Sequence, residues 1–441
     1  MVTGRSSSIR QAFTDRAAQK GCYRFLNNEK VSEQALITEM TNRCSRFAAN
    51  RHLLVIQDTT SFNLNNHYRR LKKQSGLGPI EDNFSLGFFL HCSLVMDAFS
   101  ETVLGFSDVQ LWHRRYDDPF RASKIKHLPI EAKESYKWIR ASTSTKDKLK
   151  DAASITFIED RDADIYEQFV TVPDAKTHLI IRACKQRMLS NGKKLFVSLH
   201  EQTAAGSYTI ALAKDRRQKR VQSSAILEVR FKKVCIAHPK EYYKKDIADA
   251  VHLYAVEAIE INYQGKDKIC WRLLTTHQVT CLEEALYVIE CYKKRWHIEQ
   301  LFRLLKKQGF KMEESELESG WAIRKLLAIA LNATLRIMQL MHASEEQNTQ
   351  PLDEVFSQPE QACLGELNET LTGSTTKHSN PYKYKTLVWA KWIIARLGGW
   401  KGYTSQRKPG PITLKRGMDK FTQIFSGWCL ALKYYEDVGT Q

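Results

Sequence analysis

The stretch YKKRWHIEQLFRLLK, residues 292–306, carries the pattern that decides how this part of the chain folds. Its apolar residues recur at the i, i+3, i+4 and i+7 spacing that is typical of the buried face of an α-helix. They are Ile298, Leu301, Phe302 and Leu305. We therefore expect a long helix from about residue 282 to about residue 308, with one side anchored in a core.

The same stretch has a polar face. Because an α-helix turns by about 100° per residue, four of its polar side chains fall within an arc of about 60°. They are Tyr292, Arg295, Glu299 and Lys306. A lone carboxylate flanked by phenol, guanidinium and ammonium groups could hold a metal ion beside a phosphate. It could equally lie on a solvated helix with weak ion pairs, so a functional site needs further carboxylates elsewhere in the chain.

Two aspartates follow apolar, β-prone runs and can supply those carboxylates. Asp58 ends the run at residues 52–57, and Asp160 follows the run at residues 154–158, in an acidic turn. Taken singly, each could be an Asx-turn, a helix cap or an exposed turn residue. Together with Glu299 they could converge on one point. Carboxylate oxygens suit Mg²⁺, and two such ions can drive phosphoryl transfer.

The charge of the chain favours a polyanionic partner. Its 441 residues carry 67 Lys and Arg against 49 Asp and Glu, which gives 67 − 49 = +18. An excess of this size is typical of proteins that bind nucleic acid, although a basic protein without that function is also compatible with it. The densest basic loop is KDRRQKR, residues 214–220.

The cysteines and the apolar runs bear on the compartment. Ten cysteines are scattered singly without a C-x-x-C pair, so we expect neither a zinc site nor structural disulfides. The first residues, MVTGRSSSIRQAF, lack the apolar core of a secretory signal. The most apolar runs are too short or too polar to span a bilayer. These features predict a protein of a reducing cytoplasm.

The order of the expected elements predicts a mixed α/β fold. Three strands and a helix are followed by strand, helix and strand, and a β-rich insertion at about residues 188–267 precedes the closing helix. Short helices are expected before this core, and a helical, Trp-rich region after it. We accordingly predict three domains, at residues 1–45, 46–345 and 346–441.

At this point the motifs resemble those of a known family. Tyr292, Arg295, Glu299 and Lys306 reproduce the Y-x2-R-x3-E-x6-K signature of the IS-four group of bacterial insertion-sequence DDE transposases, and the likeness is greatest to its Tn-five branch. Asp58 in LLVIQDTTS and Asp160 in EDRDADIY are similar to the two Asp motifs of that family. The resemblance also covers GCYRFLNNEKVSEQAL near the start and ARLGGW near the end.

The resemblance implies a fold and a reaction. The fold would be a ribonuclease-H-like mixed-sheet core with a β-rich insertion and helical ends. Asp58, Asp160 and Glu299 would bind two Mg²⁺ or Mn²⁺ ions. Water would nick a transposon end, the freed 3′-hydroxyl would form a hairpin on the opposite strand, and after hairpin opening the 3′ ends would join target DNA. Double-stranded DNA at the transposon ends, target DNA and a second copy of the chain would be the partners.

Five residues would contact DNA by the same resemblance. Tyr292, Arg295 and Lys306 would grip phosphates near the cut. Trp271 would stack on a flipped base, unless it is simply a half-buried aromatic residue of a strand. Arg182 would contact DNA, unless it pairs with a carboxylate of the sheet.

The start of the chain is where it departs from the family. About 20 residues precede the GCYRF segment, whereas the family has a longer helical region there for end recognition. A shortened form could keep the C-terminal region, which contributes dimer contacts in the family, and act as a non-catalytic DNA-binding or dimerising inhibitor. A ribonuclease-H-like nuclease without sequence preference is a third alternative.

Overall fold

The computed structural model divides the chain into two compact units, which are described separately below. The first unit comprises Met1–Ala48, Thr59–Asp117 and Glu299–Gln441, and the second comprises Ala49–Asp58 and Asp118–Ile298. The structure describes residues 9–12, 15–72, 75–81, 84–115, 128–212, 223–239, 247–266, 268–343, 351–373, 379–403 and 407–438. The basic loop at residues 214–220 lies outside the described residues, and so does the expected domain boundary between residues 345 and 346.

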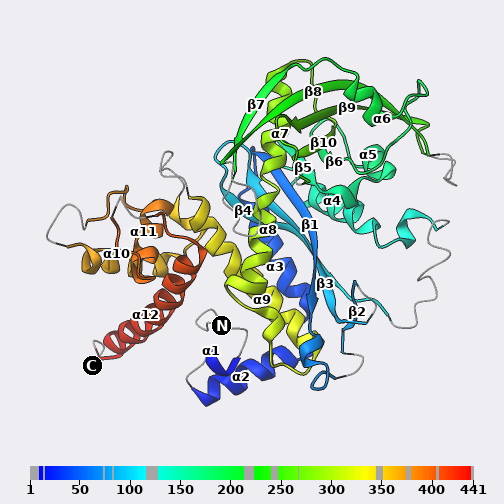
Figure 1. Cartoon of the computed structure of the whole chain (residues 1–441). Helices are drawn as coiled ribbons and strands as arrows, with labels where there is room; N and C mark the ends of the chain where they lie inside the picture. The colour runs from blue at the N-terminus through cyan, green and yellow to red at the C-terminus, as the bar shows by residue number, and fades with distance from the viewer. Residues whose placement is uncertain are drawn as a thin grey trace. The chain divides into compact units, whose positions relative to one another are not determined.

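A mixed sheet forms the core of the second unit (Figure 1). Strand β1 begins in this unit and ends in the first. Neighbouring strands β1, β5 and β6 are parallel, and the antiparallel strands β10, β9, β8 and β7 continue the sheet. The strands are β1 (His52–Asn63), β5 (Ser154–Glu159), β6 (Thr177–Arg182), β7 (Gly206–Ala211), β8 (Ser224–Ala237), β9 (Ala250–Glu260) and β10 (Cys270–Thr275).

The parallel strands are formed by apolar runs, as the sequence predicts. In β1, residues Leu53, Leu54, Val55 and Ile56 are all at most 3% exposed, because parallel strands are usually covered on both faces. The register pairs Val55 with Phe157 and Ile56 with Ile158. Continuing this register places residue 58 opposite residue 160. This register brings the two aspartates side by side, with Asp58 within β1 and Asp160 directly after β5. Strand β1 continues beyond Asp58 to Asn63, so the expectation that the strand ends at Asp58 is wrong.

Helices connect and cover these strands. Parallel neighbours need a crossover connection, and α4 (Tyr136–Lys148) precedes β5 while α5 (Tyr166–Thr171) lies between β5 and β6. Helix α7 (Leu282–Lys293) follows β10. It approaches β7 closely, since a Cβ atom on Gly206 would come within 2.6 Å of Leu282 Cδ2.

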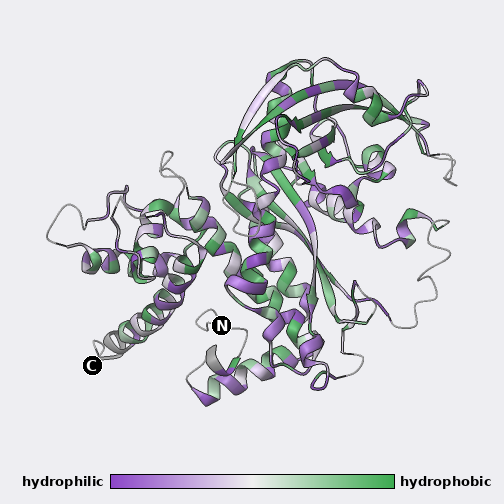
Figure 2. Ribbon diagram, in the orientation of Figure 1, coloured by the Kyte–Doolittle hydropathy of each residue, from purple (hydrophilic) through white to green (hydrophobic). Residues whose placement is uncertain are grey.

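The β-rich stretch is built on three long antiparallel strands. Apolar and charged residues alternate along β8, so bands of both colours follow one another on its ribbon in Figure 2. Alternation of this kind is typical of a strand with one buried and one solvated face. Helix α6 (Leu195–His200) packs on β8 and β9, and Lys232 Nζ donates a hydrogen bond to Ser198 Oγ at 2.9 Å.

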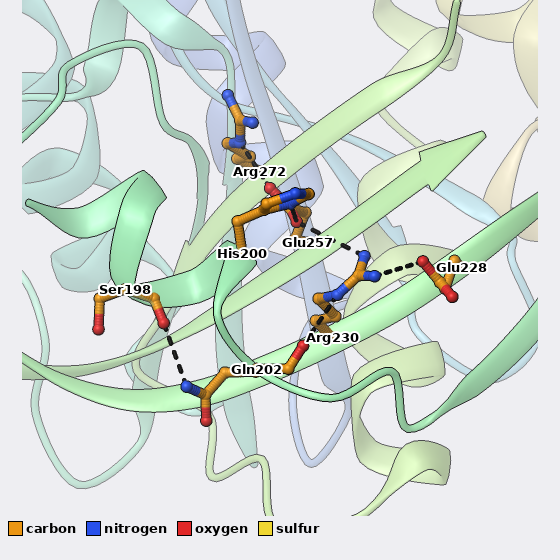
Figure 3. Close-up of polar contacts among 7 residues, drawn as sticks. All are labelled: Ser198, His200, Gln202, Glu228, Arg230, Glu257 and Arg272. Atoms are coloured by element: carbon orange, nitrogen blue, oxygen red, sulfur yellow. Dashed lines mark hydrogen bonds and ion pairs between the residues drawn. The ribbon is translucent and has the colours of Figure 1, made fainter. Parts of the chain in front are cut away.

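The buried carboxylate of Glu257 links neighbouring strands in this part of the sheet through its polar contacts (Figure 3). Glu257 is 0% exposed, and it accepts a hydrogen bond of 2.7 Å from Arg272 Nε. Arg230 Nη1 lies 3.9 Å from the same carboxylate, and His200 Nδ1 lies 3.5 Å from it. Arg230 Nε also donates to the carbonyl of Gln202 at 3.0 Å. A buried charge requires such partners, and here they come from β8, β10 and the end of α6.

The first unit consists of helices packed against a hairpin. The hairpin consists of β3 (Leu86–Asp97) and β4 (Val103–Trp112). Strand β4 contacts α3 (Glu33–Arg46), and α9 (Gly320–His342) contacts α3 and β4. The remaining elements with printed bounds are α1 (Ile9–Ala12), α2 (Arg16–Asn27), β2 (Gly78–Pro79), α10 (Gln358–Leu371), α11 (Leu387–Leu397) and α12 (Pro411–Val438).

Two glycines let α11 and α12 approach with their backbones in contact. A Cβ atom on Gly398 would overlap the carbonyl oxygen of Thr413, and one on Gly417 would overlap the carbonyl oxygen of Ile394. Neither carbonyl can move without disturbing its own helix. By contrast, Gly427, further along α12, has no atom within 4 Å of such a Cβ.

The long helix expected at about residues 282–308 is interrupted in the structure. Helix α7 ends at Lys293, α8 (Trp296–Arg303) follows, and a π-helical segment occupies Leu304–Gln308. At the break, the amides of Lys294, Arg295, His297 and Ile298 donate to the carbonyls three residues earlier. These bonds tighten the backbone relative to an α-helix, and they change the direction of the residues on either side.

The mixed α/β class, the β-rich stretch and the helices at both ends of the chain confirm the predicted fold class. The predicted domain boundaries stay a prediction. In the described part of the chain, every helix is too short or too polar to cross a membrane.

Candidate active site

The two aspartates lie side by side on adjacent parallel strands of the sheet. Asp58 is the last residue of β1 in this unit, and Asp160 directly follows β5. The Asp58 side chain is 19% exposed, and Asp160 is also half-buried. Both carboxylates can therefore be reached by a ligand, while the apolar strands behind them keep their backbones fixed.

Arg295 contacts the first aspartate from the break between α7 and α8. Its Nη1 donates a hydrogen bond to Asp58 Oδ2 at 3.1 Å, and its side chain is 15% exposed. Because both partners are largely screened from water, this charge-assisted contact is stronger than a surface ion pair. The tight turn at residues 294–298 is what places Arg295 beside the sheet.

Tyr292 contacts the second aspartate from the last turn of α7. Its hydroxyl lies 3.5 Å from Asp160 Oδ1, a long hydrogen bond in which the phenol donates. Burial raises the pKa of Tyr292, and the charge of Asp160 raises it further, whereas Arg295 and Arg182 act in the opposite direction. The phenol therefore stays protonated at neutral pH and remains a donor.

Arg182 and Trp271 both lie against Tyr292 and join the group that the two aspartates form with Tyr292 and Arg295. Arg182 ends β6, hydrogen-bonds Tyr292 and donates from Nη2 to the carbonyl of Cys270 at 3.3 Å. Trp271, the next residue on β10, is half-buried and meets Tyr292 edge-on, with ring centroids 6.2 Å apart. The structure thus brings together six of the residues singled out from the sequence: Asp58, Asp160, Arg182, Trp271, Tyr292 and Arg295.

The other two residues of the helix signature belong to the first unit. Glu299 lies in the first turn of α8 and is half-buried. Lys306 lies in the π-helical segment, where its Nζ is 5.4 Å from the ring centre of Phe62 and 4.0 Å from Glu313 Oε1. Burial lowers the pKa of Lys306, and the charge of Glu313 partly offsets this effect.

A cluster of buried polar residues lies directly behind the aspartates, and it was not predicted from the sequence. Gln57 precedes Asp58, Glu159 precedes Asp160, and both are 0% exposed. Ser142 on α4 and Gln168 on α5 contact them. The signal that could have revealed the cluster is a polar residue at the end of each buried apolar run, where alternation directs it away from the aspartates.

Burial sets the protonation state of this cluster. It raises the pKa of Glu159 to about 8, against the opposing effect of hydrogen bonds from Ser142 and Gln168. Within the described residues, Glu159 Oε2, Gln57 Oε1 and Gln168 Oε1 accept no hydrogen bond. A proton on Glu159 provides a donor for one of these neighbours, so the cluster is neutral at pH 7.

The donor chemistry of the two aspartates suits a hard divalent cation. Among the residues that the structure describes, however, no group of three His, Cys, Asp or Glu side chains is placed to hold a metal ion. Asp58 and Asp160 are thus two candidate ligands on adjacent strands of a sheet, and a metal centre that includes Glu299 remains a proposal.

Comparisons with known proteins give a distant likeness. No protein-family model matches the chain. A solved structure described as a piggyBac transposase synaptic complex with hairpin DNA is similar over 68% of this chain and 49% of its own length, so the match spans about half of that protein. The sequence identity is 8% and the TM-score is 0.32, and no argument about function is drawn from a likeness at this level.

Proposed function

We propose that this protein is a DDE-type DNA transposase of the IS-four group with a ribonuclease-H-like core, which cuts the ends of an insertion sequence and joins them to target DNA. The observation that carries the proposal is the convergence of residues from separate stretches of the chain. Asp58 and Asp160 lie side by side on adjacent strands, and two residues of the helix signature, Tyr292 and Arg295, each contact one of them.

The carboxylates would act through divalent cations. Asp58, Asp160 and Glu299 would hold two Mg²⁺ or Mn²⁺ ions, which supply activation of the attacking oxygen and charge stabilisation of the leaving oxygen when bound. In the nicking step, a water oxygen would attack phosphorus and the 3′ oxygen would leave. In hairpin formation and strand transfer, that 3′-hydroxyl would attack a phosphorus atom of the opposite strand or of target DNA, and the 3′ oxygen already bonded to that phosphorus would leave.

The neighbouring residues would orient the carboxylates and the DNA. The hydroxyl of Tyr292 donates to Asp160 and fixes its rotamer. The guanidinium of Arg295 lies against Asp58, and a guanidinium is a group that binds phosphate oxygens well. Lys306 would contribute a second cation for the strand. Trp271, held edge-on by Tyr292 beside the group, offers a ring face on which an unstacked base could lie.

An end-cleavage assay tests this function. We expect Asp58→Asn, Asp160→Asn and Glu299→Gln each to lower the rate of Mg²⁺-dependent nicking of terminal-repeat DNA by about a thousandfold or more, because each removes a metal ligand worth several kcal/mol. Asp249→Asn, which changes an exposed aspartate of the second unit, is the matched control and should nick at the wild-type rate.

Three results would count against the proposal. Nicking that survives any one of the three substitutions would remove that residue from the metal site. Binding of terminal-repeat DNA without nicking in either Mg²⁺ or Mn²⁺ would favour an inhibitor of transposition. Equal nicking of unrelated DNA would favour a nuclease without sequence preference.

A further inference from the structure

The side chains behind the aspartates form a closed hydrogen-bonded group, which we call the buried cluster: Gln57, Ser142, Glu159 and Gln168. All four are 0% exposed. Gln168 Nε2 donates to Glu159 Oε1 at 2.7 Å and to Ser142 Oγ at 3.1 Å. Gln57 Nε2 donates to Ser142 Oγ at 3.2 Å, and Ser142 Oγ donates to Glu159 Oε1 at 3.4 Å.

The buried cluster spans the two strands that carry the aspartates. Gln57 belongs to β1 and Glu159 to β5, and the parallel register places them side by side, as it does Asp58 and Asp160 one residue later. Successive side chains of a strand point to opposite faces. Gln57 and Glu159 accordingly face α4 and α5, and the two carboxylates face the other side.

Polar residues are an uncommon choice at these positions. Strands that are covered on both faces usually carry apolar residues throughout, and an apolar pair here would avoid the cost of burying polar groups. A hydrogen-bonded polar group, in contrast, accepts few geometries, because its members must keep the hydrogen bonds that they make, and in the described residues three acceptor atoms of this group are without a partner. Such a group fixes the distance and the rotation between two strands more narrowly than apolar contacts do.

We propose that Ser142 and Gln168 are positioning residues, which act through Gln57 and Glu159 to set the spacing between the carboxylates of Asp58 and Asp160. The inference rests on the proposed function, in which these carboxylates bind divalent cations. Hydrogen bonds behind metal ligands commonly govern metal affinity, and their removal costs about 10- to 100-fold in affinity or activity. Neither Ser142 nor Gln168 touches the ions or the DNA.

Two substitutions and two matched controls test the role. Gln168→Leu and Ser142→Ala remove members of the buried cluster. Gln339→Leu and Ser198→Ala change a glutamine that is 3% exposed in α9 and a serine that is 0% exposed in α6, both outside it. Each purified full-length variant is titrated with Mn²⁺ by calorimetry without DNA, and its thermal midpoint and its DNA affinity in EDTA are measured.

We expect Gln168→Leu and Ser142→Ala to raise the dissociation constant for Mn²⁺ by about tenfold or more. Their thermal midpoints and DNA affinities should stay close to those of the controls. The Mg²⁺ concentration for half-maximal nicking should rise by the same factor, and nicking at saturating Mg²⁺ should recover. Recovery separates a loss of metal affinity from general damage to the fold.

Other outcomes would overturn the inference. Wild-type affinity for Mn²⁺ in both variants would do so, and so would an equal loss in the controls. If Gln168→Leu fails to fold, Ser142→Ala decides the question. If the wild type binds Mn²⁺ through Asp58 but nicks no DNA, the proposed function fails while the affinity comparison still stands. If Asp58→Asn leaves Mn²⁺ binding unchanged, the positioning role falls.

Discussion

At the scale of single residues, a pair of half-buried histidines couples the second unit to pH. His178 on β6 and His277, just after β10, stack with ring centroids 4.2 Å apart. His277 Nε2 lies 3.0 Å from Thr156 Oγ1. Burial, aided by the charge that His178 would carry, lowers the pKa of His277 from 6.5 to about 4. His277 is therefore neutral in the folded protein at pH 5, whereas it is protonated in the unfolded chain.

This difference predicts a loss of stability in acid. Above pH 6.5 neither state binds the proton, so the stability is fully present. As the pH falls from 6.5 to 4, only the unfolded chain gains it, and the free energy of unfolding drops by up to about 3 kcal/mol. In His277→Gln, denaturant unfolding between pH 7 and pH 4 should show a correspondingly smaller drop.

Glu159 works in the opposite direction and must be separated from this effect. Its raised pKa means that its contribution is present below pH 4.5 and is lost as the pH rises towards 8. Because Glu159 is unchanged in His277→Gln, the difference between the two proteins isolates the histidine. Parallel pH profiles of wild type and variant would show that His277 is not the group responsible.

At the scale of elements, the contact between α11 and α12 depends on glycine. We expect Gly417→Ala to destabilise the protein by about 1–3 kcal/mol, because its Cβ atom would overlap the carbonyl oxygen of Ile394 and push the two helices apart. The better helix propensity of alanine, worth about 1 kcal/mol, only partly offsets this. Thermal or denaturant unfolding measures the change.

Gly427→Ala is the control within the same helix. A Cβ atom there meets nothing within 4 Å, so only the helix propensity changes and the protein should become more stable by up to about 1 kcal/mol. A stabilising effect at both positions would mean that the helices can move apart without cost.

The elements also show which parts of the fold could be predicted from the sequence and which could not. Apolar runs before Asp58 and Asp160 predicted two strands, because burial on both faces leaves a plain pattern. The second strand ends directly before Asp160 as predicted, whereas the first runs on past Asp58 to Asn63. The interruption of the helix after Lys293 has no comparable pattern in the sequence. Its residues suit a helix, and nothing in their sequence predicts the i→i−3 bonds at residues 294–298. The buried cluster stayed hidden because its partners lie on helices remote in sequence, at Ser142 and Gln168.

At the scale of the whole molecule, the net charge of +18 governs how DNA would be held. Lysines and arginines release counterions when they contact phosphates, so affinity falls linearly with salt on logarithmic axes. If about 6–10 phosphates are contacted, the dissociation constant should rise by about 10³–10⁵ between 50 and 200 mM salt. Fluorescence anisotropy with terminal-repeat DNA in EDTA measures this slope.

The same salt titration tests whether Arg295, a residue of the candidate site, contacts a phosphate. Arg295→Ala should lower the slope by about one phosphate contact, whereas Asp249→Asn should leave it almost unchanged. Affinity that is insensitive to salt would mean that the excess of positive charge serves another purpose.

The interruption between α7 and α8, which follow β10, also affects how far a local unwinding of these helices can spread. Unwinding spreads easily along an unbroken run of i→i−4 bonds and stalls where the bonding pattern changes. The turn at residues 294–298 is such a place. An opening that starts in α8 can therefore stop before it reaches Tyr292 in α7. Arg295 lies at this break, so the single sequence motif that contains Tyr292 and Glu299 is divided between two separately hydrogen-bonded helices, α7 and α8.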